Sequence, residues 1–243
     1  NPFYKTFYDL KFSVLEKWNP ELLWGDSSPV NDWWRLQSGV LMKDPTASSV
    51  QAAWQWIAPT MRMAELFYTK NGLPIDEDNT YNYERRFGTT VVSNDKKNYA
   101  RPGLRTAELH LNREPRFYTN IGFDSSEYRG WNELWTLRMK KGQTHGRIAN
   151  TSDYLITGFS LKKLVHPESE GDAYDKIIRY PWPNARLAEL YLNYAEALNE
   201  AYGPSQAVYD ALNVVRARAG IPYVEVVWSD GSLAKTLNKH TTQ

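Results

Sequence analysis

The sequence predicts a mainly α protein with loop-rich insertions and a few short strands. Two observations support this fold class. Residues 186–219 carry apolar residues at helical spacing in two runs that a Gly-Pro pair separates, and residues 59–70 carry a third such run. The segments between these runs are rich in Pro, Gly, Asn and Asp, which is typical of loops. The 243 residues are 42% hydrophobic and 23% charged, which suits a globular core.

The N-terminal third offers one clear helix. Apolar residues within 2–18 fit either a helix or a strand, and Asn19-Pro20 ends that element. Residues 21–24 suit a short strand. Residues 59–70 form a helix in this interpretation, because Pro59 suits a first turn and Met63, Leu66 and Phe67 make an apolar stripe. Asn71-Gly72 then stops the helix.

The middle of the chain reads as short strands and loops. We expect a strand at residues 91–92 and another at 117–123, after a polar motif at 112–116. A long irregular insertion follows at 124–146, and residues 154–165 suit a strand that Gly158 interrupts. The last dozen residues, 232–243, are polar and show no core pattern.

The helix pair at residues 186–219 is the clearest element. Its first helix places five apolar residues on one face: Leu187, Leu190, Tyr191, Tyr194 and Leu198. Gly203 ends that helix, and Gly220 with Pro222 ends the second. The 34-residue length equals the period of a tetratricopeptide repeat, and Ala195 and Ala207 stand where such helices approach closely. We therefore predict a tetratricopeptide-like hairpin that needs further helices to cover its apolar face.

Composition excludes several kinds of site. The chain has no Cys, so disulfides and thiolate metal sites are ruled out. The four His residues show no metal-binding spacing, and we expect no cofactor. The net charge of +1 argues against nucleic acid as a partner. Residues 85–147 nevertheless hold 13 Lys or Arg against 6 Asp or Glu, which is either a mixed solvated surface or a preference for an anionic ligand.

The aromatic residues are the strongest functional signal. Ten Trp and 16 Tyr are present, many of them in predicted loops. The face of a sugar ring stacks on Trp or Tyr, while Asn, Asp and Arg bind its hydroxyl groups. Three clusters combine such residues, and we predict that at least one of them contacts a glycan. The candidate residues are Asn31, Asp32, Trp33, Trp34 and Arg35; Trp131 and Trp135; and Tyr81 and Tyr83.

Two other chemistries have weaker support. Glu133, close to Trp131 and Trp135, is either a catalytic acid or an ordinary surface residue, and a partner carboxylate cannot be identified from sequence. Asp76 and Asp78 offer oxygen atoms to calcium, but the glycine of a calcium loop is missing. We predict that the chain is not an enzyme.

Several motifs together resemble one family. They are RLAELYLNYAEALNE at 186–200, LNVVRARAGIP at 212–222, NREPRFY at 112–118, TGF at 157–159 with Lys162 and Lys163, and the segment from Pro59-Thr60 to Pro74-Ile75. In this order they resemble the SusD/RagB-like nutrient-binding outer-membrane lipoproteins of Bacteroidetes. The Glu of NREPRF replaces the Asp of the family motif.

The resemblance implies a tetratricopeptide-like helical scaffold of SusD-like type. It implies a non-catalytic protein at the outer-membrane surface that delivers oligosaccharide or polysaccharide to a SusC-like TonB-dependent transporter. It also implies a membrane attachment only through an N-terminal lipid that this chain lacks. The alternatives are a protein-interaction lid of the transporter, a binder of a non-sugar nutrient and, less well supported, a carbohydrate-active enzyme. We expect residues 1–243 to be a single region, about the C-terminal half of a family member, because the chain opens at Asn1 without a signal peptide.

Overall fold

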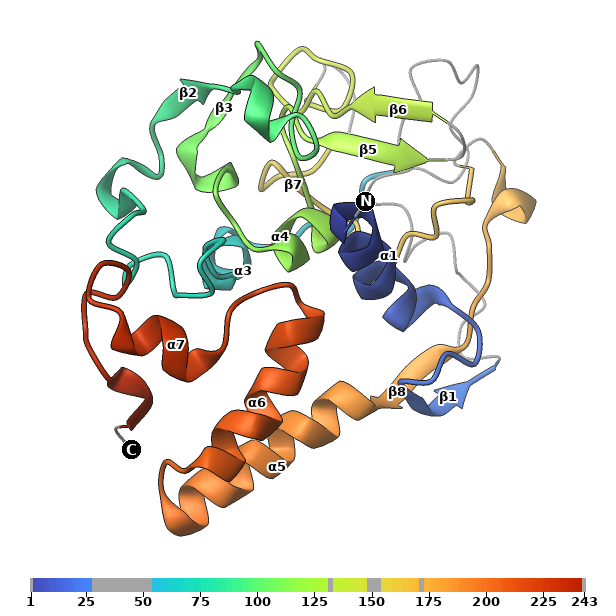
Figure 1. The fold of residues 1–243 in the computed structure, drawn as a ribbon. Helices are drawn as coiled ribbons and strands as arrows, with labels where there is room; N and C mark the ends of the chain where they lie inside the picture. Colours follow the sequence, from blue (N-terminus) through green and yellow to red (C-terminus); the bar gives the residue numbers. More distant parts are fainter. Residues whose placement is uncertain (1, 28–53, 131–132, 148–153, 171–172, 242–243) are drawn as a thin grey trace.

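The computed structural model describes residues 2–27, 54–130, 133–147, 154–170 and 173–241. Within them, α-helices are the longest elements and the strands span three to five residues (Figure 1). The helices are α1 (Pro2–Leu15), α3 (Met61–Leu66), α4 (Pro115–Asn120), α5 (Leu187–Tyr202), α6 (Gln206–Arg218) and α7 (Val224–Ser229). Short 3-10 turns lie at Tyr83–Arg85, Asn94–Lys96, Glu108–His110, Tyr174–Lys176 and Lys239–Thr241.

The strands pair two by two, always antiparallel. They are β1 (Leu22–Asp26), β2 (Thr89–Val91), β3 (Arg105–Ala107), β4 (Ile121–Phe123), β5 (Glu127–Gly130), β6 (Glu133–Thr136), β7 (Phe159–Leu161) and β8 (Trp182–Arg186). The pairs are β1 with β8, β2 with β3, β4 with β7, and β5 with β6. Because β8 runs directly into α5, its pairing with β1 ties the helix hairpin to the N-terminal part of the chain.

The largest core cluster lies around α4 and β4. Phe117 and Phe123 are fully buried and stack with ring centroids 5.5 Å apart, and Tyr118 packs beside them. Ala64 of α3, also fully buried, packs against the same cluster. This burial of aromatic surface anchors the short elements, which are too small to be stable by themselves.

The helix hairpin forms as predicted, although its buried face differs in part. Gly203 and Gly220 take left-handed backbone at φ 77° and 70°, and they end α5 and α6. Ala195 is buried at the contact with α6, whereas Ala207 is exposed and Ala211 takes the place expected for it. The prediction for Ala207 was therefore wrong by one helical turn.

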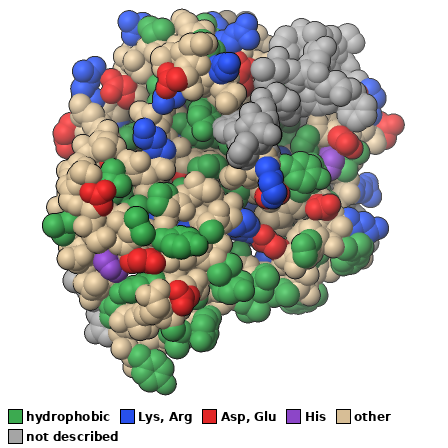
Figure 2. Space-filling view, viewed as in Figure 1, with side chains coloured by type: hydrophobic (Ala, Val, Ile, Leu, Met, Phe, Trp, Pro, Cys, Tyr) green, Lys and Arg blue, Asp and Glu red, His purple; other side chains and the backbone are tan. Residues whose placement is uncertain are grey.

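One side of the predicted apolar face of α5 is exposed. Tyr191 and Leu198 pack against α6, but Leu190 is 52% and Tyr194 is 56% exposed. Figure 2 shows apolar side chains gathered along the lower part of this view, over α5 and α6. Among the described residues no helix covers this side, in agreement with the expectation that a single hairpin leaves apolar surface open.

Three sequence predictions need correction in the middle of the chain. Residues 117–123 are not one strand, because Pro115 starts the helix α4 and only the last three residues form β4. The insertion at 124–146 is not wholly irregular: it contains the hairpin of β5 and β6. The strand expected at 154–165 is limited to β7, which begins directly after the left-handed Gly158.

Both ends of the chain also differ from expectation. Residues 2–15 are helical, which resolves the ambiguity of that segment. The tail beyond residue 232 contributes to a core, because Ala234 is 2% exposed and packs with Trp228 and Leu73. The backbone N–H of Lys235 donates to the Glu77 carbonyl at 2.9 Å, so this tail is hydrogen-bonded to the loop at 76–79.

Candidate functional site

Six of the nine predicted ligand residues lie outside the described part of the chain. They are Asn31, Asp32, Trp33, Trp34, Arg35 and Trp131. The remaining three, Trp135, Tyr81 and Tyr83, have defined surroundings, and the structure separates their roles.

Trp135 is an internal packing residue of the β5–β6 hairpin. It stands opposite Tyr128 in the strand register, with ring centroids 5.3 Å apart, and meets the His145 ring edge to face at 5.9 Å. The indole is half-buried against a core cluster that includes Leu137 and Tyr180. The contacts of Trp135 are therefore those of a loop anchor.

Tyr81 points into the protein. It is 8% exposed and packs in the cluster around Phe117. Burial raises the pKa of its phenol, and its hydroxyl oxygen has no hydrogen-bond partner among the described residues. Its ring does not face solvent, where a ligand would approach.

Tyr83 opens a stack of three side chains. The Arg86 guanidinium lies between two rings, 3.8 Å from the Tyr83 centroid and 4.2 Å from the Phe87 centroid. Glu65 of α3 accepts from Arg86 Nε at 2.8 Å, which fixes the guanidinium and raises its pKa. Phe87 is 56% exposed at the outer end of the stack. The sequence analysis did not identify Phe87. A usable signal was the spacing of Tyr83, Arg86 and Phe87, which allows one turn to bring the three side chains together.

A second aromatic surface was also missed. Trp54 and Trp56 meet edge to face with ring centroids 5.0 Å apart, and Trp56 is 49% exposed. Between them Gln55 takes left-handed backbone at φ 57° and is 2% exposed. Within the described ranges, neither the oxygen nor the nitrogen of its amide has a hydrogen-bond partner, which is a costly state for a buried polar group. We call Trp54, Gln55 and Trp56 the indole–amide site.

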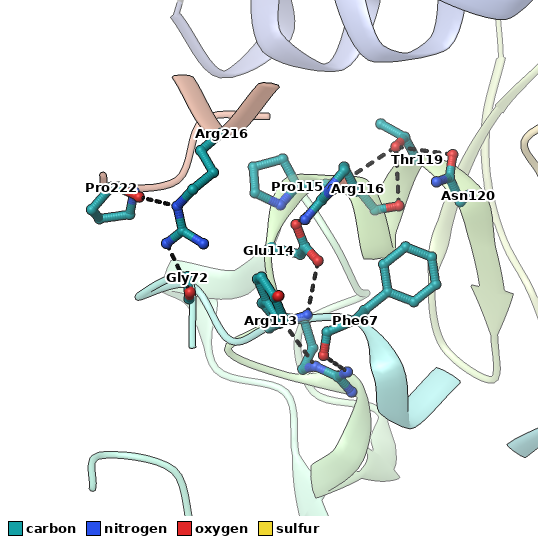
Figure 3. Close-up of polar contacts among 11 residues, drawn as sticks. Phe67, Gly72, Arg113, Glu114, Pro115, Arg116, Thr119, Asn120, Arg216 and Pro222 are labelled. Atoms are coloured by element: carbon teal, nitrogen blue, oxygen red, sulfur yellow. Dashed lines mark hydrogen bonds and ion pairs between the residues drawn. The ribbon is translucent and has the colours of Figure 1, made fainter. Parts of the chain in front are cut away.

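The NREPRF motif acts on the backbone. Arg113 is 2% exposed, and the three shortest hydrogen bonds of its guanidinium go to the carbonyls of Ala64 at 2.7 Å, Leu109 at 2.8 Å and Phe67 at 2.5 Å. Longer bonds reach the carbonyls of Tyr68 at 3.3 Å and Glu65 at 3.5 Å, and Figure 3 shows the contact with Phe67. These bonds explain why α3 ends at Leu66 instead of continuing to residue 70, since the carbonyls of its last turn bind the guanidinium. Burial lowers the pKa of Arg113. The charged side chain of the motif therefore has a structural role, which is to bind backbone carbonyls.

Glu114 and Arg216 complete this clamp. Glu114 is 1% exposed, accepts from the Tyr68 N–H at 2.8 Å and pairs with Arg116. Arg216 of α6 donates to the Gly72 and Pro222 carbonyls at 2.8 and 2.7 Å (Figure 3). Arg216 thereby joins α6 to the turn after α3.

Asp78, one of the two predicted calcium ligands, has a structural role. Asp78 is fully buried, and its oxygens accept from Thr69, Asn71 and Thr80. Those bonds occupy the atoms that a calcium ion would use. In the described ranges no group of three or more His, Asp or Glu residues suits a metal ion. Likewise, within those ranges no helix has the length and apolarity needed to cross a bilayer.

Comparisons with known proteins give a consistent result. The sequence pattern of the SusD family matches residues 20–242. The solved structure of BT4246 is similar at 30% identity and a TM-score of 0.73, over 92% of this chain and 37% of that one. No match is found among the curated proteins.

Two further solved structures share the fold. A SusD-like protein from Bacteroides fragilis has 21% identity and a TM-score of 0.59, over 88% of this chain and 39% of that one. Another, titled a SusD-like carbohydrate binding protein from the same organism, has 22% identity and a TM-score of 0.50, over 73% and 31%. The chain therefore spans less than two fifths of the length of the structures that it matches.

Proposed function

The chain belongs to the SusD family, and from this premise we propose that it binds oligosaccharide or polysaccharide without cleaving it. The observation that carries the proposal is the indole–amide site. Exposed Trp56 offers a flat apolar face for a sugar ring, and the Trp54 ring meets it edge to face.

Further parts of the function follow from the family. We propose that the protein passes its ligand to a SusC-like TonB-dependent transporter, and that it works at the outer-membrane surface, held there by an N-terminal lipid. The candidates Asn31 to Arg35 and Trp131 remain part of the proposed ligand surface. Residues 31–35 precede the indole–amide site by about twenty positions in the chain.

Affinity gel electrophoresis against a panel of neutral and acidic polysaccharides tests the proposal. The wild type is compared with Trp56→Ala, with Trp33→Ala/Trp34→Ala, and with Trp18→Ala as the control. Trp18 is 60% exposed and lies outside all the aromatic clusters. Loss of a stacking indole removes about 2 kcal/mol of binding free energy, or roughly 30-fold in affinity.

The outcomes distinguish the sites. Retardation that Trp56→Ala reduces and Trp18→Ala keeps supports the indole–amide site, whereas retardation that only the double variant abolishes moves the site to Trp33 and Trp34. Release of reducing ends during incubation would contradict a non-catalytic role. A folded wild type that no polysaccharide retards would refute glycan binding.

A protein-interaction role is the second candidate. The exposed side of α5, with Leu190 and Tyr194, is its supporting observation, because aromatic and leucine side chains on one helix side suit a protein contact. Charged substitutions there would disturb transporter association while leaving glycan binding intact.

A further inference from the structure

The turn directly before β2 presents an aromatic ring to solvent (Figure 1). The Arg86 guanidinium lies 3.8 Å from the Tyr83 ring centroid and 4.2 Å from the Phe87 ring centroid, so it contacts both rings. Tyr83 is half-buried against the largest core cluster, whereas Phe87 is 56% exposed. The stack therefore starts at the core and ends in an exposed, flat, apolar ring.

Hydrogen bonds fix the geometry of this stack. Arg86 Nε donates to Glu65 of α3 at 2.8 Å, and Arg86 Nη1 donates to the Tyr83 carbonyl at 3.0 Å. The Gly88 N–H donates to the Arg85 carbonyl at 2.7 Å, which closes the backbone of the turn. A ring that is already held in place loses little conformational entropy when a ligand stacks on it, so more of the contact energy appears as affinity.

A charged pair lies beside the same turn. Arg85 Nη2 and Glu108 Oε1 are 3.0 Å apart, and the two side chains are 67% and 23% exposed. The Glu108 N–H donates to the Gly88 carbonyl at 2.9 Å, and a Cβ at Gly88 would lie 3.5 Å from Glu108 Oε1. The carboxylate thus lies against the residue that follows Phe87, where glycine places no side chain.

This combination matches the surface of a sugar ring. The C–H face of a pyranose stacks on an exposed aromatic ring, and neighbouring hydroxyl groups bind a donor and an acceptor that stand side by side. Arg85 supplies N–H donors and Glu108 supplies acceptor oxygens. Because both groups are charged, their hydrogen bonds to hydroxyl groups are stronger than those between neutral groups.

The charges around this turn indicate the class of sugar. Arg85 is paired with Glu108, and Arg86 is paired with Glu65. Glu84, in the same turn, is exposed and adds a negative charge. An acidic sugar would meet two guanidinium groups that carboxylates already neutralise, and Glu84 would repel it. The arginines of this turn therefore fit a mixed solvated surface, and the arrangement favours a neutral sugar.

We propose that Phe87, Arg85 and Glu108 form a stacking subsite for a neutral sugar unit of the glycan, with Tyr83 and Arg86 holding the Phe87 ring in place. We call these five residues the Phe87 platform. The inference rests on the proposed glycan-binding function, and it adds to that function a second contact surface and the class of sugar. The platform and the indole–amide site lie in different segments of the chain, so substitutions test them separately.

The first experiment is affinity electrophoresis of the full chain in dextran, amylopectin, galactomannan, arabinoxylan and, as the acidic comparison, polygalacturonate. Phe87→Ala should weaken the affinity for the neutral polysaccharide that retards the wild type by about tenfold, the value of one stacking contact. Phe87→Tyr keeps a flat ring and should keep the affinity, whereas Phe87→Leu should behave like Phe87→Ala. Arg85→Gln should weaken the affinity about fivefold, because it removes the charged donor.

The matched control is Tyr8→Ala. The Tyr8 ring is 54% exposed and stacks on Phe12 at 4.2 Å, so this variant removes an equally exposed, stacked ring from a different element, α1. Within the described ranges Phe87 belongs to no core cluster, so Phe87→Ala should stay folded, which circular dichroism checks. Equal affinities of Phe87→Ala and Tyr8→Ala would overturn the proposal. Retardation by polygalacturonate that depends on Phe87 would overturn the assignment to a neutral sugar.

The second experiment detects contact at the ring itself. The eight Phe residues are labelled with 4-fluorophenylalanine, and the fluorine resonance of Phe87 is the one that Phe87→Leu removes. Millimolar oligosaccharides of the same four neutral polysaccharides should shift this resonance. Retardation of the wild type without such a shift, and without an effect of Phe87→Ala, would refute the Phe87 platform and leave the proposed function standing. No retardation and no shift with any of these glycans would refute both.

Discussion

Replacement of Arg113 by Ala tests whether the NREPRF motif is a structural clamp. The substitution removes the guanidinium that links α3, the turn after it and the segment before α4. It leaves the carbonyls of Ala64, Leu109 and Phe67 buried without their donor. Because Arg113 is 2% exposed and its hydrogen bonds go to backbone carbonyls, the effect should be on folding.

The magnitude follows from the contacts. Three short hydrogen bonds from a charged donor contribute about 1.5 kcal/mol each, and the cost of burying the guanidinium offsets part of that sum. We expect the free energy of unfolding to fall by about 3–5 kcal/mol. Arg113→Lys keeps the charge but not the planar fork, so it should lose about 2 kcal/mol.

Urea unfolding at pH 7, followed by tryptophan fluorescence and far-ultraviolet circular dichroism, measures both losses. Arg85→Ala serves as the control, because the Arg85 side chain is 67% exposed and its ion pair with Glu108 should contribute at most about 1 kcal/mol. A loss below about 1 kcal/mol in Arg113→Ala, equal to that of Arg85→Ala, would show that the clamp reasoning is wrong.

Three further predictions concern backbone and titration. Gly72→Ala should destabilise by more than 2 kcal/mol, since the backbone has φ 76° and the new Cβ would lie 2.5 Å from Arg216; Gly103→Ala, at φ 83° with open space, should lose only about 1 kcal/mol. Equal losses in urea would contradict this. Thr60→Ala should lower the free energy of unfolding by about 1 kcal/mol, because the Thr60 hydroxyl accepts from the Met63 N–H at the start of α3. Thr60→Ser keeps the hydroxyl and should keep most of that stability. An unchanged free energy of unfolding in Thr60→Ala would show that the cap is unimportant. Burial lowers the pKa of His110 from 6.5 to about 3, so the unfolded chain binds more protons below pH 6.5 and stability is lost as pH falls. Between pH 7.5 and pH 5 this residue should account for about 2 kcal/mol, and His110→Gln should show a correspondingly flatter pH profile of unfolding; an unchanged profile would refute the assignment.

The elements that the sequence predicted well are those with local signals. In α5 and α6 a helical period coincides with a glycine at each end, and both glycines take the left-handed backbone that ends a helix. The short strand predicted at 21–24 is found as β1, one or two residues later, and the strand predicted at 91–92 overlaps β2 at Val91. For the two helices, the decisive interactions lie within a few residues of one another.

The candidate site was only partly predictable. The sequence analysis identified Tyr83 from the aromatic cluster in which it lies. It did not identify the exposed neighbour Phe87 or the Trp54–Trp56 pair. The spacing of aromatics cannot show whether a ring is buried, as Tyr81 is, or exposed, as Phe87 is, because that depends on distant residues.

The sequence by itself determined the family, the helix hairpin and its ends, since these depend on motifs and on backbone preferences close in the chain. The tertiary structure alone decided where α3 ends, because the Arg113 guanidinium reaches it from more than 40 positions away. It also decided that the Lys162 ammonium donates to the carbonyls of Tyr118 and Glu127. Burial and charge are set by whatever packs around a residue, and in this protein those neighbours come from α1, α4, α6 and β8, which meet only when the chain is folded.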